Sequence, residues 1–138
     1  MTKAVVRLPT FVDIETPYSA RTPKGVIKNI RYTRACVRDS ILRGEIPFAS
    51  HIFYTQSGIL DDNSPAERQK GIMAGKMMIE RLNATTVVYT DLGMSKGMEL
   101  GIEMAKKSRR RIEYRSLGKG WEKKFLRNEK NHSQNGIW

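Results

Sequence analysis

The feature that most constrains the fold is a run of six β-branched or aromatic residues at 85–90. A continuous apolar strand of this kind is typical of a parallel sheet that is buried on both faces. A short polar loop follows, and a helical pattern over 95–107 carries Gly97, Glu99 and Gly101 near its start. Ligands of open α/β sheets bind outside the carboxyl ends of the strands. We therefore expect a functional site where this strand ends.

Strands and helices alternate along the rest of the chain. Residues 11–14, 47–54 and 111–115 have the apolar content of strands. Helical spacing, with Gly44 after the first helix and Ser64 and Pro65 at the start of the second, predicts helices over 26–43 and 65–82. This alternation predicts a three-layer α/β fold, with an open, parallel, doubly wound sheet of four to five strands as in flavodoxin and Rossmann folds.

The same pattern predicts one main domain and a short extension. Residues 1–117 form the domain, and residues 118–138 form a basic, partly flexible C-terminal extension with a short amphipathic helix and a loose tail from Asn128. We expect Cys36 to be buried as a small apolar group. Met73, Met77 and Met78 are expected to fill the core.

Composition excludes several classes of protein. The hydrophobic content of 39% over 138 residues is too high for a disordered chain. No apolar run reaches the length of a membrane span, and no signal peptide is expected. The lone Cys36 excludes an internal disulfide and suits the cytoplasm. No metal-ligand spacing, Walker loop or G-x-G-x-x-G motif occurs, so we expect neither a metal nor a cofactor.

Positive charge is concentrated toward the C-terminus. The net charge is +11, and residues 103–130 contain eleven Lys or Arg and four Glu, most densely at 106–111. One interpretation is a solvated helix end whose cations suit the helix dipole. The other is attraction of a nucleic acid or a phosphorylated ligand.

Polar residues gather where the predicted strands end. If the strands are parallel, the loops at 15–25, 53–64 and 91–96 line one crevice suited to a polar, sugar-bearing ligand. The residues expected to bind this ligand are Tyr18, Ser19, Arg21, His51, Tyr54, Asp62, Ser95 and Gly97. For His51, a purely structural hydrogen bond is the alternative interpretation.

Three segments resemble the nucleoside 2-deoxyribosyltransferase superfamily, which includes the deoxynucleoside monophosphate N-glycosidases. They are Glu-Thr-Pro-Tyr at 15–18, Val-Val-Tyr-Thr at 87–90 and Gly-Met-Glu-Leu-Gly at 97–101. The resemblance covers about residues 10–116. The chain is also similar to an uncharacterised, often phage-encoded subgroup with Arg-Asp-Ser, Ala-Ser-His and Tyr-Thr-Gln segments, found here at 38–40, 49–51 and 54–56. For a phage-encoded chain, the expected compartment is the host cytoplasm.

The resemblance implies roles for individual residues. Glu99 takes the place of the glutamate that attacks the anomeric carbon of the sugar. The family's Asp before the late strand has no counterpart here. Asp91 is a candidate to replace it, and Asp61, Asp62 and Glu67 could do so only through a different backbone path. Ser19 and Arg21 supply groups comparable to those that hold a 5′-phosphate. Relatives often complete the site from a neighbouring subunit, so a homodimer or larger homo-oligomer is expected, with the Met-rich helix at 65–82 offering surplus apolar surface.

Three functions therefore remain as hypotheses. The first is an N-glycosidic-bond hydrolase or transferase that acts on a (deoxy)nucleoside or nucleotide through Glu99. The second is a non-catalytic protein that binds or sequesters a nucleotide-derived ligand. The third is a nucleic-acid-binding protein that uses the basic segment at 106–111 and the tail.

Overall fold

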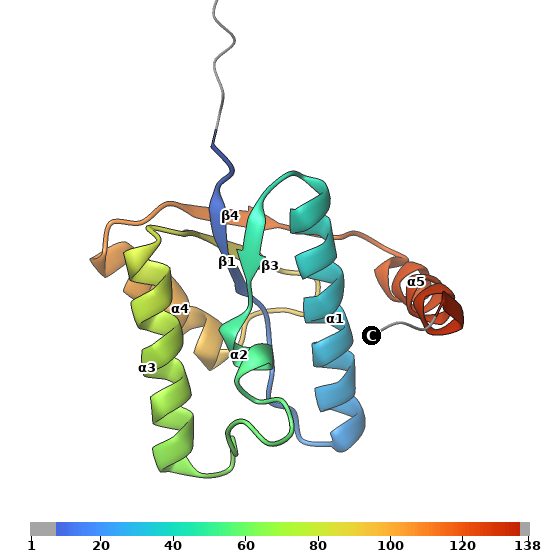
Figure 1. The fold of residues 1–138 in the computed structure, drawn as a ribbon, viewed down its shortest axis with the longest axis horizontal. Coiled ribbons are helices and arrows are strands. Elements are labelled where there is room, and N and C mark those ends of the chain that lie inside the picture. Colours follow the sequence, from blue (N-terminus) through green and yellow to red (C-terminus); the bar gives the residue numbers. More distant parts are fainter. Residues whose placement is uncertain (1–7, 136–138) are drawn as a thin grey trace, which may run out of the picture.

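The strand predicted at 85–90 lies inside a four-stranded, all-parallel sheet. In a computed structural model, which describes residues 8–135, the order of strands is β2-β1-β3-β4 (Figure 1). All five residues of β3 (Thr85–Tyr89) are buried. The other strands are β1 (Phe11–Glu15), β2 (Ile46–Phe48) and β4 (Ile112–Arg115). The predicted α/β class with a parallel, doubly wound sheet is confirmed.

Helices cover the two faces of this sheet. On one face, α1 (Pro23–Leu42) lies beside α5 (Trp121–Asn135), and the rings of Tyr32 and Trp121 are 4.9 Å apart between centroids (Figure 1). The other layer holds α3 (Pro65–Arg81) and α4 (Lys96–Lys107), which are joined by a hydrogen bond from Ser108 to Glu80. The connections reverse direction between β1 and β3, and ligands of doubly wound sheets bind at this point.

The two faces of β1 differ in character. Val12 and Ile14 pack in an apolar core with Tyr32 and the buried Cys36, as expected for this cysteine. Asp13 and Glu15 point to the opposite face, toward α4. Because side chains alternate along a strand, the central strand of the sheet carries an apolar face and an acidic face.

Two predicted elements are wrong in their extent. The strand expected at 47–54 ends at Phe48, because the chain turns at Ala49 into the one-turn helix α2 (Ser50–Phe53). The loose tail expected from Asn128 is helical as far as Asn135. Packing of Trp121 on α1 and an ion pair of 3.8 Å between Arg31 and Glu129 hold α5 in place. The ends of the chain at 1–7 and 136–138 lie outside the described residues.

The prediction that the methionines of the second long helix fill the core is also wrong. Met73, Met77 and Met78 are 47%, 52% and 37% exposed. Helix α3 packs on α2, where Gly75 lies against Ser50, and buries little beyond Gly75 and Ile79. An apolar surface therefore remains on α3. Within residues 8–135, no helix combines the length and the apolar character that a membrane span requires.

Candidate functional site

The loop after β1 is anchored at the carboxyl edge of the sheet by buried hydroxyl groups. The Thr16 hydroxyl lies 2.6 Å from the Thr33 hydroxyl and 2.7 Å from His51 Nε2. Asn29 donates a hydrogen bond of 2.8 Å to the carbonyl of Tyr18. These contacts fix the start of the loop, while Ser19 and Arg21 are exposed further along it.

His51 and Tyr18, two of the residues expected to bind the ligand, lie together. Their rings meet edge to face with centroids 6.5 Å apart. Burial lowers the pKa of His51 to about 4, so the imidazole is neutral at physiological pH. The contact of Nε2 with Thr16 supports the structural interpretation of His51.

Tyr54 and Asp62 make their contacts within the segment between β2 and α3. The Tyr54 ring packs edge to face on Phe48 and Phe53. The carboxylate of Asp62 is 3.9 Å from the Arg68 guanidinium. The structure gives these two residues no contact with the loop that carries Tyr18.

Asp91 ties the end of β3 to the loop after β4. Its carboxylate accepts hydrogen bonds from the Tyr32 hydroxyl, the Ser116 hydroxyl and the backbone amides of Leu117 and Gly118. Partial burial alone would raise the pKa of Asp91, but these hydrogen bonds outweigh it and lower the pKa to about 2. The predicted role of Asp91 as the acid does not fit this environment, because the carboxyl group has no proton to give at neutral pH.

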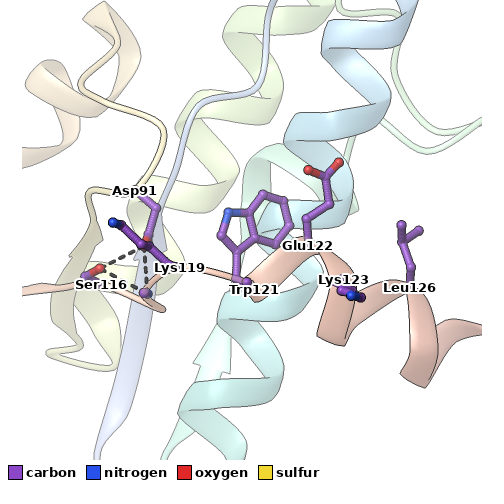
Figure 2. A pocket seen from close by; sticks show the side chains of 9 residues that line it. Asp91, Ser116, Lys119, Trp121, Glu122, Lys123 and Leu126 are labelled. Atoms are coloured by element: carbon purple, nitrogen blue, oxygen red, sulfur yellow. Dashed lines mark hydrogen bonds between the residues drawn. The ribbon is translucent and has the colours of Figure 1, made fainter.

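A surface cavity of about 770 Å³ lies beside Asp91 (Figure 2). Its wall runs from Ser116 through Gly118, Lys119 and Gly120 into the first turns of α5. Gly118 and Gly120 have φ angles of +87° and +82°, which glycine adopts without strain. Lys119 and Lys123 line the cavity together with Trp121 and Glu122. The lysines and the helix start can attract an anionic group.

The start of α4 is capped by a side chain but does not direct Glu99 inward. Ser95 is the N-cap and accepts a hydrogen bond from the Met98 amide, and Gly97 is exposed. The side chain of Glu99 is exposed and has no hydrogen bond or ion pair with the described residues. It is two residues from Gly101, which corresponds to about 200° around a helix, and Gly101 faces β1. Glu99 therefore points away from the flank of α4 that meets β1.

The acidic group that the structure does place at the end of β1 is Glu15. Its carboxyl group fills the space over Gly101, where a Cβ atom would overlap it. Burial and the nearby Asp13 raise the pKa of Glu15 well above its usual value, and the more distant Arg110 opposes this effect only partly. Glu15 therefore carries a proton under conditions in which an exposed glutamate is ionised.

Asp13 lies on the same face of β1 as Glu15 and is linked through Thr86 to the buried Arg110. The Thr86 hydroxyl donates to Asp13 at 3.1 Å and accepts from Arg110 at 2.8 Å, and Arg110 also donates to the Ala84 carbonyl at 3.1 Å. Burial raises the pKa of Asp13 to about 6, although Thr86 and Arg110 act in the opposite direction. Arg110 belongs to the basic segment expected to attract nucleic acid, but its guanidinium lies inside the protein.

Glu15 is not among the residues predicted for the site, because the sequence pattern assigns it to the loop after the first strand. A signal for it does exist. Asp13, Ile14 and Glu15 alternate in polarity as a strand does, and Gly101 lies on the side of α4 that carries its buried residues. No group of three potential metal ligands occurs among the residues that the structure describes.

Comparison with known families gives one match. A family model described as a domain of unknown function (DUF7768) matches residues 10–115, a range that includes all four strands and helices α1–α4. Neither the curated proteins nor the solved structures give a match to the chain.

The contacts of Asp91 predict a specific sensitivity to acid. Because its pKa is lowered in the folded state, Asp91 stabilises the fold fully above its usual pKa of 3.8, and this contribution is lost as the pH falls toward 2. Asp91→Asn should lower the free energy of unfolding at pH 7 by about 1–3 kcal/mol. Urea unfolding between pH 2.5 and 7 measures both effects, and equal pH dependence of the variant and the wild type would contradict the assigned hydrogen bonds.

The close approach of Glu15 to Gly101 predicts that the effect of Gly101→Ala on stability changes sign when the Glu15 side chain is removed. Gly101→Ala should destabilise the wild-type protein by about 1–3 kcal/mol, because the added methyl group displaces a buried carboxyl group. In a Glu15→Ala background the same change should stabilise the protein by up to about 1 kcal/mol, through the higher helix propensity of alanine. Thermal unfolding of the four proteins in this cycle tests the contact, and the same sign in both backgrounds would disprove it.

Proposed function

The chain belongs to the DUF7768 family, and we propose that it hydrolyses the N-glycosidic bond of a nucleoside or nucleotide with Glu15 as the proton donor. One observation carries this proposal: a carboxyl group with a raised pKa lies at the end of the central strand, over a glycine of α4. General acids need a pKa near the working pH, and burial is the usual means of raising that of a glutamate. The resemblance of the chain to N-glycosidases is a second, weaker support.

The proposed reaction uses this proton to release the base. Glu15 gives its proton to the departing nitrogen of the base while the bond from that nitrogen to the anomeric carbon breaks. A water molecule then attacks the anomeric carbon, where the positive charge of the sugar is greatest, and gives a proton back to Glu15. The products are the free base and the free sugar, and the carboxyl group ends protonated as it began.

The charge at the carboxyl edge favours a phosphorylated substrate over a nucleoside. Lys119 and Lys123 line the cavity beside Asp91, and Arg21 is exposed in the loop after β1. A phosphate attracted by these cations would leave the sugar and base to extend along the strand ends. The predicted contribution of Ser19 and Arg21 to phosphate binding stays part of the proposal.

A second candidate function is nucleotide binding without chemistry. The observation that favours it is the use of Asp91 and His51 in structural contacts, together with the outward direction of Glu99. Under this alternative, Glu15 and Asp13 only pack beneath α4.

Two isosteric variants distinguish Glu15 from Glu99 as the reactive carboxyl group. We expect the wild type to release free base from a deoxynucleoside monophosphate, as measured by chromatography over a panel of bases. Glu15→Gln should lower the rate by about 100-fold or more, as is typical when a general acid is lost. The amide resembles a protonated carboxyl group, so this variant should fold, and circular dichroism checks that it does.

Glu99→Gln is the matched control and should retain activity. A loss confined to Glu99→Gln would instead support the nucleophile expected from the resemblance. If no substrate in the panel releases a base, hydrolysis is disproved for those substrates. Calorimetry with the same nucleotides would then test the binding function.

We also propose that the protein self-associates through α3. The support is the exposed apolar surface formed by Ile72, Met73, Met77 and Met78, because surplus apolar patches commonly mark interfaces. A two-fold pair is the simplest arrangement. The free thiol of Cys36 is consistent with the proposed cytoplasmic location.

Light scattering tests the association. The wild type should have at least twice the chain mass of 15.8 kDa at micromolar concentration. Met77→Glu should give a monomer, because it places a charge in the interface. Ile41→Glu, at a residue of similar exposure on α1 (55% against 52%), should not. A monomeric wild type would contradict the proposal.

A further inference from the structure

Most of the net positive charge of the protein lies on one helical layer. Residues 21–43 contain seven Lys or Arg and one Asp, and residues 119–130 contain five Lys or Arg and two Glu. These segments hold α1 and α5, so this layer accounts for +9 of the net charge of +11. The segment at 106–111 has fewer exposed, unpaired cations than its sequence suggests, since Arg110 is buried and Arg111 pairs with Glu113 at 3.0 Å.

The cations of α1 form a single stripe. Lys24, Lys28, Arg31, Arg34 and Arg38 follow one another at steps of three or four residues. At about 100° per residue they fall within about 120° of the helix circumference, and they span about 21 Å along its axis. The buried side of α1, with Asn29, Thr33 and Cys36, lies opposite. The stripe therefore faces outward over most of the length of the helix.

This stripe opposes the stability of the helix that carries it. Neighbouring like charges at three- and four-residue steps destabilise a helix by about 0.2–0.5 kcal/mol per pair, and four such pairs occur here. No acidic residue lies in the first turn of α1, where the helix dipole would favour one, and Lys24 lies there instead. By contrast, α4 has Glu99 in its first turn and Lys106 and Lys107 in its last. If the outer side of α1 only faced water, it would not require this continuous row of like charges.

Helix α5 extends the positive surface. It lies beside α1 through the contact of Trp121 with Tyr32, and Lys123, Arg127 and Lys130 are exposed along one side of it at helical spacing (Figure 1). Arg31 is the one cation of the α1 stripe with an ion pair to a described residue, Glu129 on α5. We name the two rows of cations, on α1 and α5, the basic face.

We infer that the basic face binds double-stranded nucleic acid through its phosphates. A row of cations about 21 Å long, of which Arg31 alone pairs with a described residue, matches the dense, regular charge of a duplex backbone. Arg and Lys are the residues that most often contact phosphates. Exposed aromatic side chains, which would stack on unpaired bases, are absent from the described part of the basic face, so a duplex fits better than a single strand. Duplex binding does not require Glu15, which lies on the other face of the sheet, but it shares Lys123 with the proposed phosphate site.

Binding of a fluorescent DNA duplex of mixed sequence, followed by anisotropy at several salt concentrations, tests this inference. The side chains of Lys28, Arg34 and Arg38 are exposed and have no partner among the described residues. Replacing all three with Gln should reduce the slope of log affinity against log salt by about 2.7, which is 0.9 for each lost phosphate contact. Affinity near 0.1 M salt should fall by more than about 100-fold.

The control removes the same charge elsewhere. Lys106, Lys107 and Arg109 are exposed near the end of α4, and their replacement with Gln should change the slope little. Equal losses in the two triple variants would overturn the inference, because net charge alone would then explain binding. A wild type that does not bind the duplex would also overturn it. If vesicles rich in phosphatidylserine bind with dependence on the basic face while the duplex does not, the partner is a membrane surface and the inference is wrong.

Discussion

Two carboxyl groups on the inner strand β1, that of the buried Asp13 and that of the partly buried Glu15, determine how the layers above this strand can pack. Removing a carboxylate from water is costly unless it is paired, hydrogen-bonded or protonated. Here Asp13 accepts a hydrogen bond from the Thr86 hydroxyl, and Arg110 supplies positive charge without direct contact. The raised pKa of Glu15 favours its protonated form. The glycine at 101 leaves the room that the Glu15 side chain needs beneath α4. The packing of three elements therefore depends on two residues of one strand.

This constraint also assigns different tasks to the two sides of the sheet. The face under α1 is apolar, so α1 and α5 are free to use their outer surfaces for positive charge. The face under α4 holds the protonatable groups, at the point where ligands of doubly wound sheets bind. The α3 helix covers little of the sheet and keeps an apolar outer surface, which is the proposed contact with a second copy of the chain. The proposed reaction, duplex binding and self-association thus centre on different parts of one small domain, although Lys123 belongs both to the proposed phosphate site and to the basic face.

The fold could be predicted from the sequence because its signals are local. Apolar runs and helical spacing mark β3, α1, α3 and α4 to within a few residues, and the cap at Ser64 falls where expected. The site was harder to predict because its contacts are distant in the sequence. Glu15 and Gly101 approach each other closely although they are 86 residues apart in the sequence, and Asp91 forms hydrogen bonds with Tyr32 and Gly118. From the sequence alone, a glutamate at the end of a strand cannot be distinguished from a loop residue, because the sequence does not show which helix packs over it. The exposed methionines of α3 have a similar cause, since their spacing does not indicate which surface packs on the neighbouring helix.

The pKa of Glu15 decides whether this carboxyl group is protonated in the folded protein, and NMR titration of the side-chain carboxyl carbons measures it. Assignment by comparison with Glu15→Gln identifies the signal. We predict that Glu15 titrates well above the usual glutamate value of 4.5, with Asp13 near 6. In Asp13→Asn the Glu15 signal should titrate at a lower pH, because the repulsion between the two groups is removed. A Glu15 signal that titrates at or below 4.5 in the folded wild type would contradict both the protonated carboxyl group and its proposed role as the acid.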